Sequence, residues 1–204
     1  MPIFRKGDRK IAFIHIPKAA GSSIEMHFTS SGWEMDFYKP CSHPNTPAMH
    51  HCVYDELKKL VLDLDDIPSF CIVRNPYKRM VSEWRWQRNV MRTTRVNFID
   101  FVHRVEVSLK HTLTYWDNHW RPQSDFLNDN IDRVIKIERL DQDFEAFSKE
   151  HELGFTESLP RFGKAKFTKH PRLDFDENTI DRIRRIYAND FSRLGYSKDV
   201  PVLR

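Results

Sequence analysis

The 204-residue chain has little of what marks secreted or membrane proteins. It contains three cysteines, Cys41, Cys52 and Cys71, which cannot all pair with one another and do not form a disulfide framework. No apolar run approaches the length of a membrane span, and the first ten residues lack the apolar core of a signal peptide. The sequence therefore predicts a soluble protein of a reducing compartment, the cytoplasm.

The chain also lacks a large excess of either charge, and it contains no internal repeat. The chain carries 33 Lys and Arg against 29 Asp and Glu, so its net charge of +4 is compatible with anionic ligands. No second feature indicates nucleic-acid binding, and we expect no nucleic-acid partner. Internal repeats, low-complexity tracts and linkers are absent from the sequence, and this length is enough for one core. Residues 1–204 are predicted to form a single domain.

The most informative segment is residues 11–25, IAFIHIPKAAGSSIE, where an apolar strand enters a turn of small residues and then a helix. Small residues let the backbone approach a ligand closely, and a helix N-terminus presents free N–H groups and a positive dipole end. The glycine and serines would serve equally well as helix caps, but Lys18 favours an oxyanion site. The residues of this expected site are Pro17, Lys18, Ala19, Ala20, Gly21, Ser22 and Ser23.

The position of the lysine argues against an ordinary ATPase. In the pattern G-x-x-x-x-G-K-[ST] the lysine directly follows the last glycine, whereas Lys18 precedes Gly21. The segment HIPKAAGSS instead resembles the 5′-phosphosulfate loop of PAPS-dependent sulfotransferases, in their carbohydrate-modifying branch (PAPS is 3′-phosphoadenosine 5′-phosphosulfate). The resemblance implies an enzyme that uses PAPS, releases the bisphosphate PAP and requires no metal.

A second segment, residues 69–86, offers a grip for another phosphate. Ser69–Val73 is typical of a buried parallel strand, and Asn75-Pro76 of a helix start. Arg74 then lies at the carboxyl end of the strand, where α/β sheets bind ligands and a guanidinium grips phosphate with two hydrogen bonds. The spacing of Arg74 and Ser82 is similar to the family's 3′-phosphate site, which implies that both bind the cofactor. Taken alone, each has a structural alternative, an ion pair or a surface helix position.

Sulfuryl transfer also needs a base, and histidine titrates near neutral pH. His50 and His51 come directly before a predicted helix. The family has a histidine in this interval, followed by a helix with a pattern similar to residues 51–57, which favours His51 over His50 as the base. The alternative is that both only begin the helix or contact solvent. The remaining histidines, among them His15 and His119, are expected to be structural.

The same loop contains the ligand types of a structural zinc site, but their spacing does not fit the usual ligand pairs. We therefore expect no metal site. The residues of this disfavoured alternative are Cys41, His43, His50, His51 and Cys52.

Apolar periodicity predicts strands and helices in alternation. Expected strands lie near residues 11–16, 33–38, 69–73 and 134–137, and expected helices near residues 53–64, 98–109 and 177–194. Asp141 and Asp176 are predicted helix caps, and Gly195 a stop. Such alternation predicts an α/β fold, a P-loop NTPase-like parallel sheet with helices on both faces.

The function expected from these patterns is in-line transfer of the sulfuryl group from PAPS to an acceptor hydroxyl, on a glycan in the leading interpretation. Lys18 would stabilise the leaving phosphate, by analogy with phosphoryl transfer. Two alternatives remain, a P-loop kinase-like phosphotransferase and a noncatalytic nucleotide- or glycan-binding module. No motif marks the acceptor or the oligomeric state. Tryptophans such as Trp86 either stack on sugars or pack in the core, and Lys164 and Lys166 either touch the cofactor or are solvated.

Overall fold

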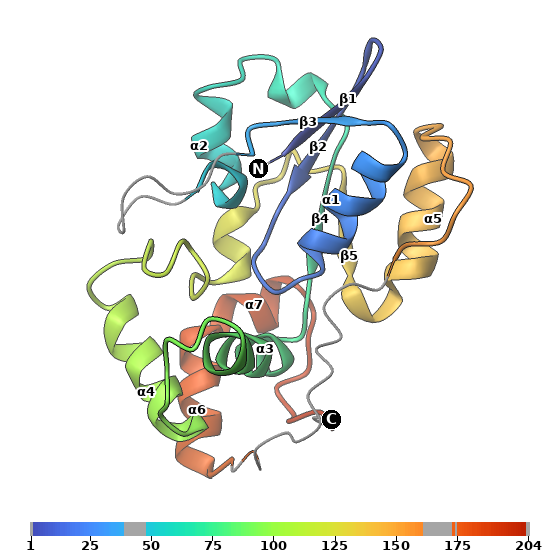
Figure 1. Ribbon diagram of the computed structural model, residues 1–204. Helices are drawn as coiled ribbons and strands as arrows, with labels where there is room; N and C mark the ends of the chain where they lie inside the picture. The colour runs from blue at the N-terminus through green and yellow to red at the C-terminus, as the bar shows by residue number, and fades with distance from the viewer. Residues whose placement is uncertain (1, 39–47, 161–172, 174, 203–204) are drawn as a thin grey trace.

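Five strands of the computed structural model form one sheet in the order β3-β1-β2-β4-β5 (Figure 1). The structure describes residues 2–38, 48–160, 173 and 175–202. β4 is buried along its whole length because helices and neighbouring strands cover it, which suits its apolar sequence SFCIV. The strands are β1 (Ile3–Lys6), β2 (Arg9–Ile14), β3 (Glu34–Asp36), β4 (Ser69–Val73) and β5 (Arg133–Lys136).

Four of the five strands share one direction. β2, β4 and β5 pair in parallel, whereas β1 is antiparallel to both of its neighbours, β2 and β3. The expectation of a parallel sheet is therefore wrong at β1, which runs against the other four strands between β3 and β2. β1 and β2 form a hairpin whose turn contains Gly7 at φ +60°. The four-residue β1 buries only Ile3 and Phe4, which is too short a pattern to be recognised in the sequence.

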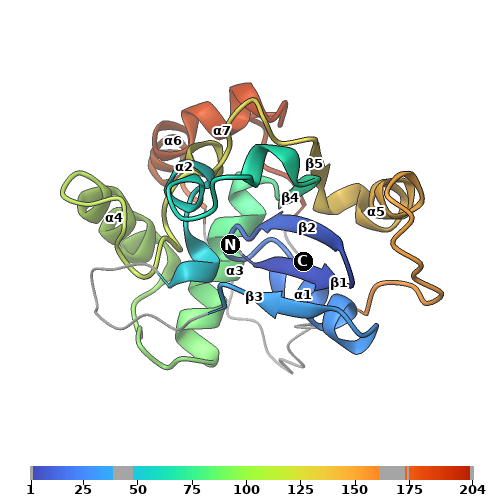
Figure 2. The same ribbon diagram turned by 90° about the horizontal axis from the view of Figure 1, so that it is seen from above.

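Helices lie on both sides of the sheet, as predicted. α1 and α5 lie on one side and α2 on the other, while α3, α4, α6 and α7 gather below the ends of β2 and β4 in Figure 1 (Figures 1 and 2). The α-helices are α1 (Gly21–Ser30), α2 (Tyr54–Lys58), α3 (Pro76–Asn89), α4 (Phe98–Leu109), α5 (Leu140–Glu150), α6 (Glu177–Ile186) and α7 (Ala188–Arg193). The 3₁₀ turns are η1 (Met49–His51), η2 (Leu64–Asp66), η3 (Gln123–Phe126) and η4 (Ile137–Arg139).

Two apolar clusters hold these layers together. Around the sheet, aromatic rings stack across β1, β2, β4 and α1, with Phe4 and Phe28 centroids 3.9 Å apart and Phe13 and Phe70 4.9 Å apart. A second cluster packs α3, α4, α6 and α7 around the buried Trp120. Burial of large aromatic surfaces is the main source of stability in both clusters.

The helix boundaries differ from the sequence expectation in three places. α2 ends at Lys58, well short of residue 64, and the segment expected as one helix after Asp176 divides into α6 and α7 at Tyr187. α5 begins at Leu140, so Asp141 lies in its first turn and is not its cap. The Asp176 cap is confirmed, since its carboxylate accepts the Thr179 N–H at 2.7 Å. None of the described helices combines the length and apolarity needed to cross a bilayer.

Candidate active site

The turn between β2 and α1 has an unusual backbone. Lys18 and Ala20 adopt left-handed conformations, with φ of +67° and +66°, which residues with a side chain rarely do. Arg79 of α3 holds the turn in place: its fully buried guanidinium donates to the carbonyl oxygens of Pro17 at 3.0 Å and His119 at 2.9 Å. The strained turn is thus clamped to a segment that lies a hundred residues further along the chain.

The start of α1 presents backbone N–H groups at this turn. The Ala19 N–H donates to the carbonyl oxygen of Ile16 at 3.3 Å, so it does not point outward. The amides of Ala20, Gly21 and Ser22 remain as donors for an anion at the helix N-terminus. The Ala19 amide is thus already bonded within the turn, and anion binding by the remaining amides stays a prediction.

A cavity of about 770 Å³, called here the anion cavity, opens beside the turn. Both sequence motifs contribute to its walls, although they lie far apart in the sequence. Pro17 and Ala19 are buried and do not line it. Seven of the expected cofactor-binding residues line it: Lys18, Ala20, Gly21, Ser22, Ser23, Arg74 and Ser82; His15, residues 137–142, Leu159 and Pro160 complete the lining.

Arg74 is fixed in the cavity wall, and only part of its hydrogen-bonding capacity is satisfied by the described residues. Its backbone N–H donates to Gln123 Oε1 at 2.8 Å, and its Nη1 donates to the Lys18 carbonyl at 3.2 Å. Its Nε is buried and has no hydrogen-bond partner among the described residues. Burial lowers the pKa of Arg74 below its usual value. A buried guanidinium N–H without a partner is costly, and a phosphate oxygen would satisfy it.

Lys18 supplies a second cation. Its Nζ lies 4.5 Å from the centroid of the Trp86 ring. Burial lowers the pKa of Lys18 to about 8, an effect that Glu83 opposes and that Arg74 and Arg79 reinforce. The ammonium therefore stays largely protonated at neutral pH while it faces a partly desolvated cavity.

Four imidazole rings, the histidine cluster of His15, His50, His51 and His119, lie next to the anion cavity. The ring centroids are 4.1 Å apart for His50 and His51, 4.7 Å for His15 and His51, and 5.1 Å for His51 and His119. Of these four, only His15 is part of the cavity wall. His15 thus bridges the phosphate-binding turn and the two histidines that the sequence proposed as bases.

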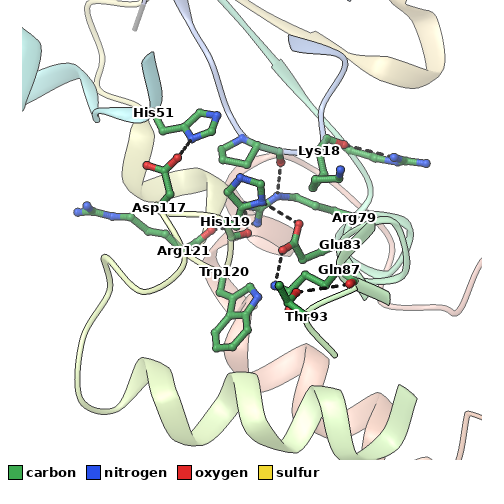
Figure 3. Close-up of polar contacts among 12 residues, drawn as sticks. Lys18, His51, Arg79, Glu83, Gln87, Thr93, Asp117, His119, Trp120 and Arg121 are labelled. Atoms are coloured by element: carbon green, nitrogen blue, oxygen red, sulfur yellow. Dashed lines mark hydrogen bonds and ion pairs between the residues drawn. The ribbon is translucent and has the colours of Figure 1, made fainter. Parts of the chain in front are cut away.

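Three histidines of the cluster share one arrangement, in which a carboxylate lies within hydrogen-bond distance of Nδ1. A carboxylate at Nδ1 fixes the ring orientation and directs Nε2 toward other groups. Two of these pairs are drawn in Figure 3. The pairs and their Nδ1-to-oxygen distances are His15 with Glu25 (2.6 Å), His51 with Asp117 (2.7 Å) and His119 with Glu83 (2.9 Å).

His51 is held from two directions. Asp117 bonds its ring, and Asn118 Nδ2 donates to its carbonyl oxygen at 2.9 Å. Trp116, Asp117 and Asn118 all have left-handed backbones, with φ of +51°, +58° and +61°, so this segment is strained at the site. Burial lowers the pKa of His51 well below its usual value, although the hydrogen bond that the Asp117 carboxylate accepts acts in the opposite direction. His51 is therefore neutral at pH 7 and able to accept a proton.

The comparison with known families agrees with this geometry. The sequence model of the sulfotransferase family matches residues 1–197, nearly the whole chain. The chain belongs to the sulfotransferase family. No curated protein and no solved structure matches it significantly. Membership makes the chain an enzyme that catalyses sulfuryl transfer.

Several residues of this candidate site have no recognisable signal in the sequence. Arg79, Glu83 and Asp117 were not identified because acidic and basic residues are frequent and no spacing marks them. His119 was expected to be structural, yet it joins the cluster. The segment 116–120, WDNHW, carries the one usable indication, a dense group of polar and aromatic side chains without helical or strand periodicity.

The disfavoured zinc site is only partly within the described residues, because Cys41 and His43 lie outside them, as do Lys164 and Lys166. Cys52 donates its thiol to the Ala48 carbonyl at 3.8 Å. His50, His51 and Asp117 bring potential ligand atoms within 4.8 Å of one another. In this sulfotransferase the Asp117 carboxylate already bonds the His51 ring, which is the arrangement that orients a base.

Proposed function

We propose that this sulfotransferase moves the sulfuryl group of PAPS to a hydroxyl of a carbohydrate acceptor and releases PAP. The observation that carries the proposal is the anion cavity, which Lys18 and Arg74 both line and where the buried Arg74 Nε has no partner within the described part of the chain. Two separate cationic side chains suit a nucleotide with phosphate groups at both its 3′ and 5′ positions. A strand, an anion-binding turn and a helix in this order also support a P-loop-like fold within one domain.

The roles of the two phosphate-binding groups follow from their positions. Lys18 and the amides at the start of α1 would hold the 5′-phosphosulfate, while Arg74 and Ser82 would hold the 3′-phosphate. Negative charge grows on the oxygen that leaves with PAP, and a fixed cation next to that oxygen lowers the barrier. We assign this contribution to Lys18. Because the chain supplies this positive charge itself, we propose that no metal is required.

The proton of the acceptor hydroxyl would pass to His51. Burial keeps His51 neutral before the reaction, and Asp117 stabilises the imidazolium that forms. His50 is the second candidate. It is half-buried and stacks on Tyr38, with centroids 4.5 Å apart.

Binding of PAP, compared with ATP and Mg²⁺ by thermal shift, tests the donor. A ligand that binds only the folded state raises its apparent stability. We expect PAP to raise the melting temperature and ATP with Mg²⁺ not to do so, and we expect Arg74→Ala to abolish the PAP effect. Stabilisation by ATP with Mg²⁺ alone would favour a phosphotransferase instead.

Transfer of labelled sulfate from PAPS, screened over glycans and small hydroxyl compounds, tests the acceptor. The proposal predicts label on a glycan. Label on small alcohols alone would contradict the carbohydrate assignment, and PAP binding without transfer to any acceptor would identify a noncatalytic module.

A further inference from the structure

Trp86 lies between two groups of the proposed active site. It comes from α3, and it is half-buried, unlike its neighbour Trp84, which is 2% exposed and packs in the core. The Lys18 ammonium lies over the ring of Trp86, 4.5 Å from its centroid. The His119 ring stacks on the same indole at 4.8 Å with an interplanar angle of 21°. Trp86 thus joins the phosphate-binding turn to the histidine cluster.

A buried carboxylate lies beside this stack. Glu83 lies three residues before Trp86 on α3 and is 2% exposed; it bonds His119 through one oxygen at 2.9 Å and Gln87 through the other at 2.7 Å (Figure 3). Burial alone would raise the pKa of Glu83, but His119 and Lys18 hold it below its usual value. Glu83 acts on the Lys18 ammonium as a charge at a distance, because the carboxylate bonds His119 and Gln87 and forms no ion pair with Lys18.

The charges that face Lys18 come from α3 and from the residue that follows β4. Glu83 and Arg79 belong to α3, and Arg74 follows β4, so a single negative charge opposes two positive ones. Among the described residues, no carboxylate lies within ion-pair distance of the Lys18 Nζ. An ammonium over an indole ring is attracted by the negative face of the ring and keeps its N–H groups for other partners.

We propose that Trp86 is a positioning residue that holds the Lys18 ammonium over its ring and leaves the ammonium hydrogens directed to the anion cavity. The inference rests on the proposed role of Lys18 in sulfuryl transfer. The stacked His119, tied to Glu83, fixes the indole in turn. A carboxylate in place of the ring would hold Lys18 more strongly but would compete with the phosphosulfate for the same hydrogens.

Site-specific incorporation of mono-, di- and trifluorotryptophan at position 86 tests this role, because fluorine weakens the negative face of the ring with little change of shape. We expect kcat to fall stepwise, by about two- to thirty-fold over the series, as a cation–π attraction of ordinary strength is lost. KM for the acceptor should not change. The matched control is the same series at Trp33, whose ring carries Arg9 at 5.6 Å outside the site.

A readout without turnover separates this inference from the proposed function. The pH dependence of Lys18 acylation by acetic anhydride, followed by mass spectrometry, reports the pKa of its amine. The midpoint should fall stepwise with fluorination at position 86 and should also fall in Glu83→Gln, and it should not move in the Trp33 series. If the acylation midpoint falls stepwise but the protein transfers no sulfuryl group, the proposed function is refuted while the contact between Lys18 and the Trp86 ring is supported. Unchanged midpoints and unchanged kcat in the trifluoro variant would overturn the inference.

Discussion

The anion side of the site and its histidine side are built in different ways. The turn that carries Lys18 and the start of α1 are continuous in the sequence, and backbone geometry shapes them. The histidine cluster is assembled from distant segments: 66 residues separate His51 from Asp117, and 36 separate Glu83 from His119. The turn on the anion side is therefore a local structure, whereas the histidine cluster exists only in the folded chain.

This difference determines how each side should respond to mutation. Backbone amides and a helix N-terminus survive most side-chain changes, so the anion side loses only what the changed side chain supplied. A carboxylate–histidine pair in a buried site depends on both members, because removal of one leaves the other buried without a partner. The effects of substitutions on turnover and binding should therefore differ in size between the two sides, and they should be less additive within the histidine cluster.

The largest effect is expected for His51→Ala. Loss of a general base typically slows turnover by about 10²–10⁴-fold. PAP affinity should stay within a few fold, because His51 does not line the anion cavity. Initial rates of sulfate transfer and PAP titration by calorimetry measure the two quantities. A larger loss of rate in His50→Ala than in His51→Ala would move the base to His50.

Asp117→Asn extends this test to the pair. Asp117 raises the pKa of His51 against the larger effect of burial. Without that carboxylate the pKa of His51 falls further, so the acidic limb of the kcat–pH profile should move to lower pH while the plateau drops. The His51→Ala, Asp117→Asn double variant should be no slower than His51→Ala alone. Additive losses would show that the two residues act separately.

Lys18→Ala should be the largest loss on the anion side. Removal of one preorganised group that stabilises developing charge costs about 10²–10³-fold in kcat. PAP binding should weaken less, because Arg74 and the amides of α1 remain. The comparison of kcat with the PAP dissociation constant decides the point. Full turnover in this variant would remove Lys18 from the mechanism.

Arg74→Lys should affect binding more than turnover. The substitution keeps the charge but loses the fork of donors, including the buried Nε that has no partner among the described residues. A charge-assisted hydrogen bond contributes about 1.5–3 kcal/mol, so PAP should bind roughly ten- to hundredfold more weakly. Adenosine 5′-phosphosulfate, which lacks the 3′-phosphate, is the matched control ligand and should lose much less affinity. Equal losses for both ligands would place Arg74 at the 5′ end.

The same contrast explains what could be predicted from the sequence. The strand Ser69–Val73 and the helix Phe98–Leu109 follow from periodicity and local motifs, and the structure confirms both. The same motifs indicated Lys18 and Arg74, which line one cavity, while their binding of a cofactor stays a prediction. The Asp117 and Glu83 pairs could not be predicted, because they depend on how α3 and the segment before η3 pack. Arg79 illustrates the reason: its role is to bond carbonyl oxygens, and no side-chain motif records that.

The smallest effect is expected where the two sides touch, at Gly21. The His15 ring lies so close to this glycine that an added Cβ would be 1.9 Å from His15 Nε2. Gly21→Ala must therefore displace the imidazole from Glu25, and overpacking of this kind costs about 1–3 kcal/mol. The melting temperature should fall by roughly 2–10 °C, as measured by calorimetry.

The double variant His15→Ala, Gly21→Ala distinguishes a steric cause from a backbone one. If the imidazole is the obstacle, adding Gly21→Ala to His15→Ala should cost little further stability, because the methyl group then occupies space that the ring has left. A full additional loss in the double variant would instead mean that the backbone at the start of α1 requires glycine for itself. In that case the turn and the start of α1 would keep their structure independently of His15. His15 would then not couple the anion side to the histidine cluster.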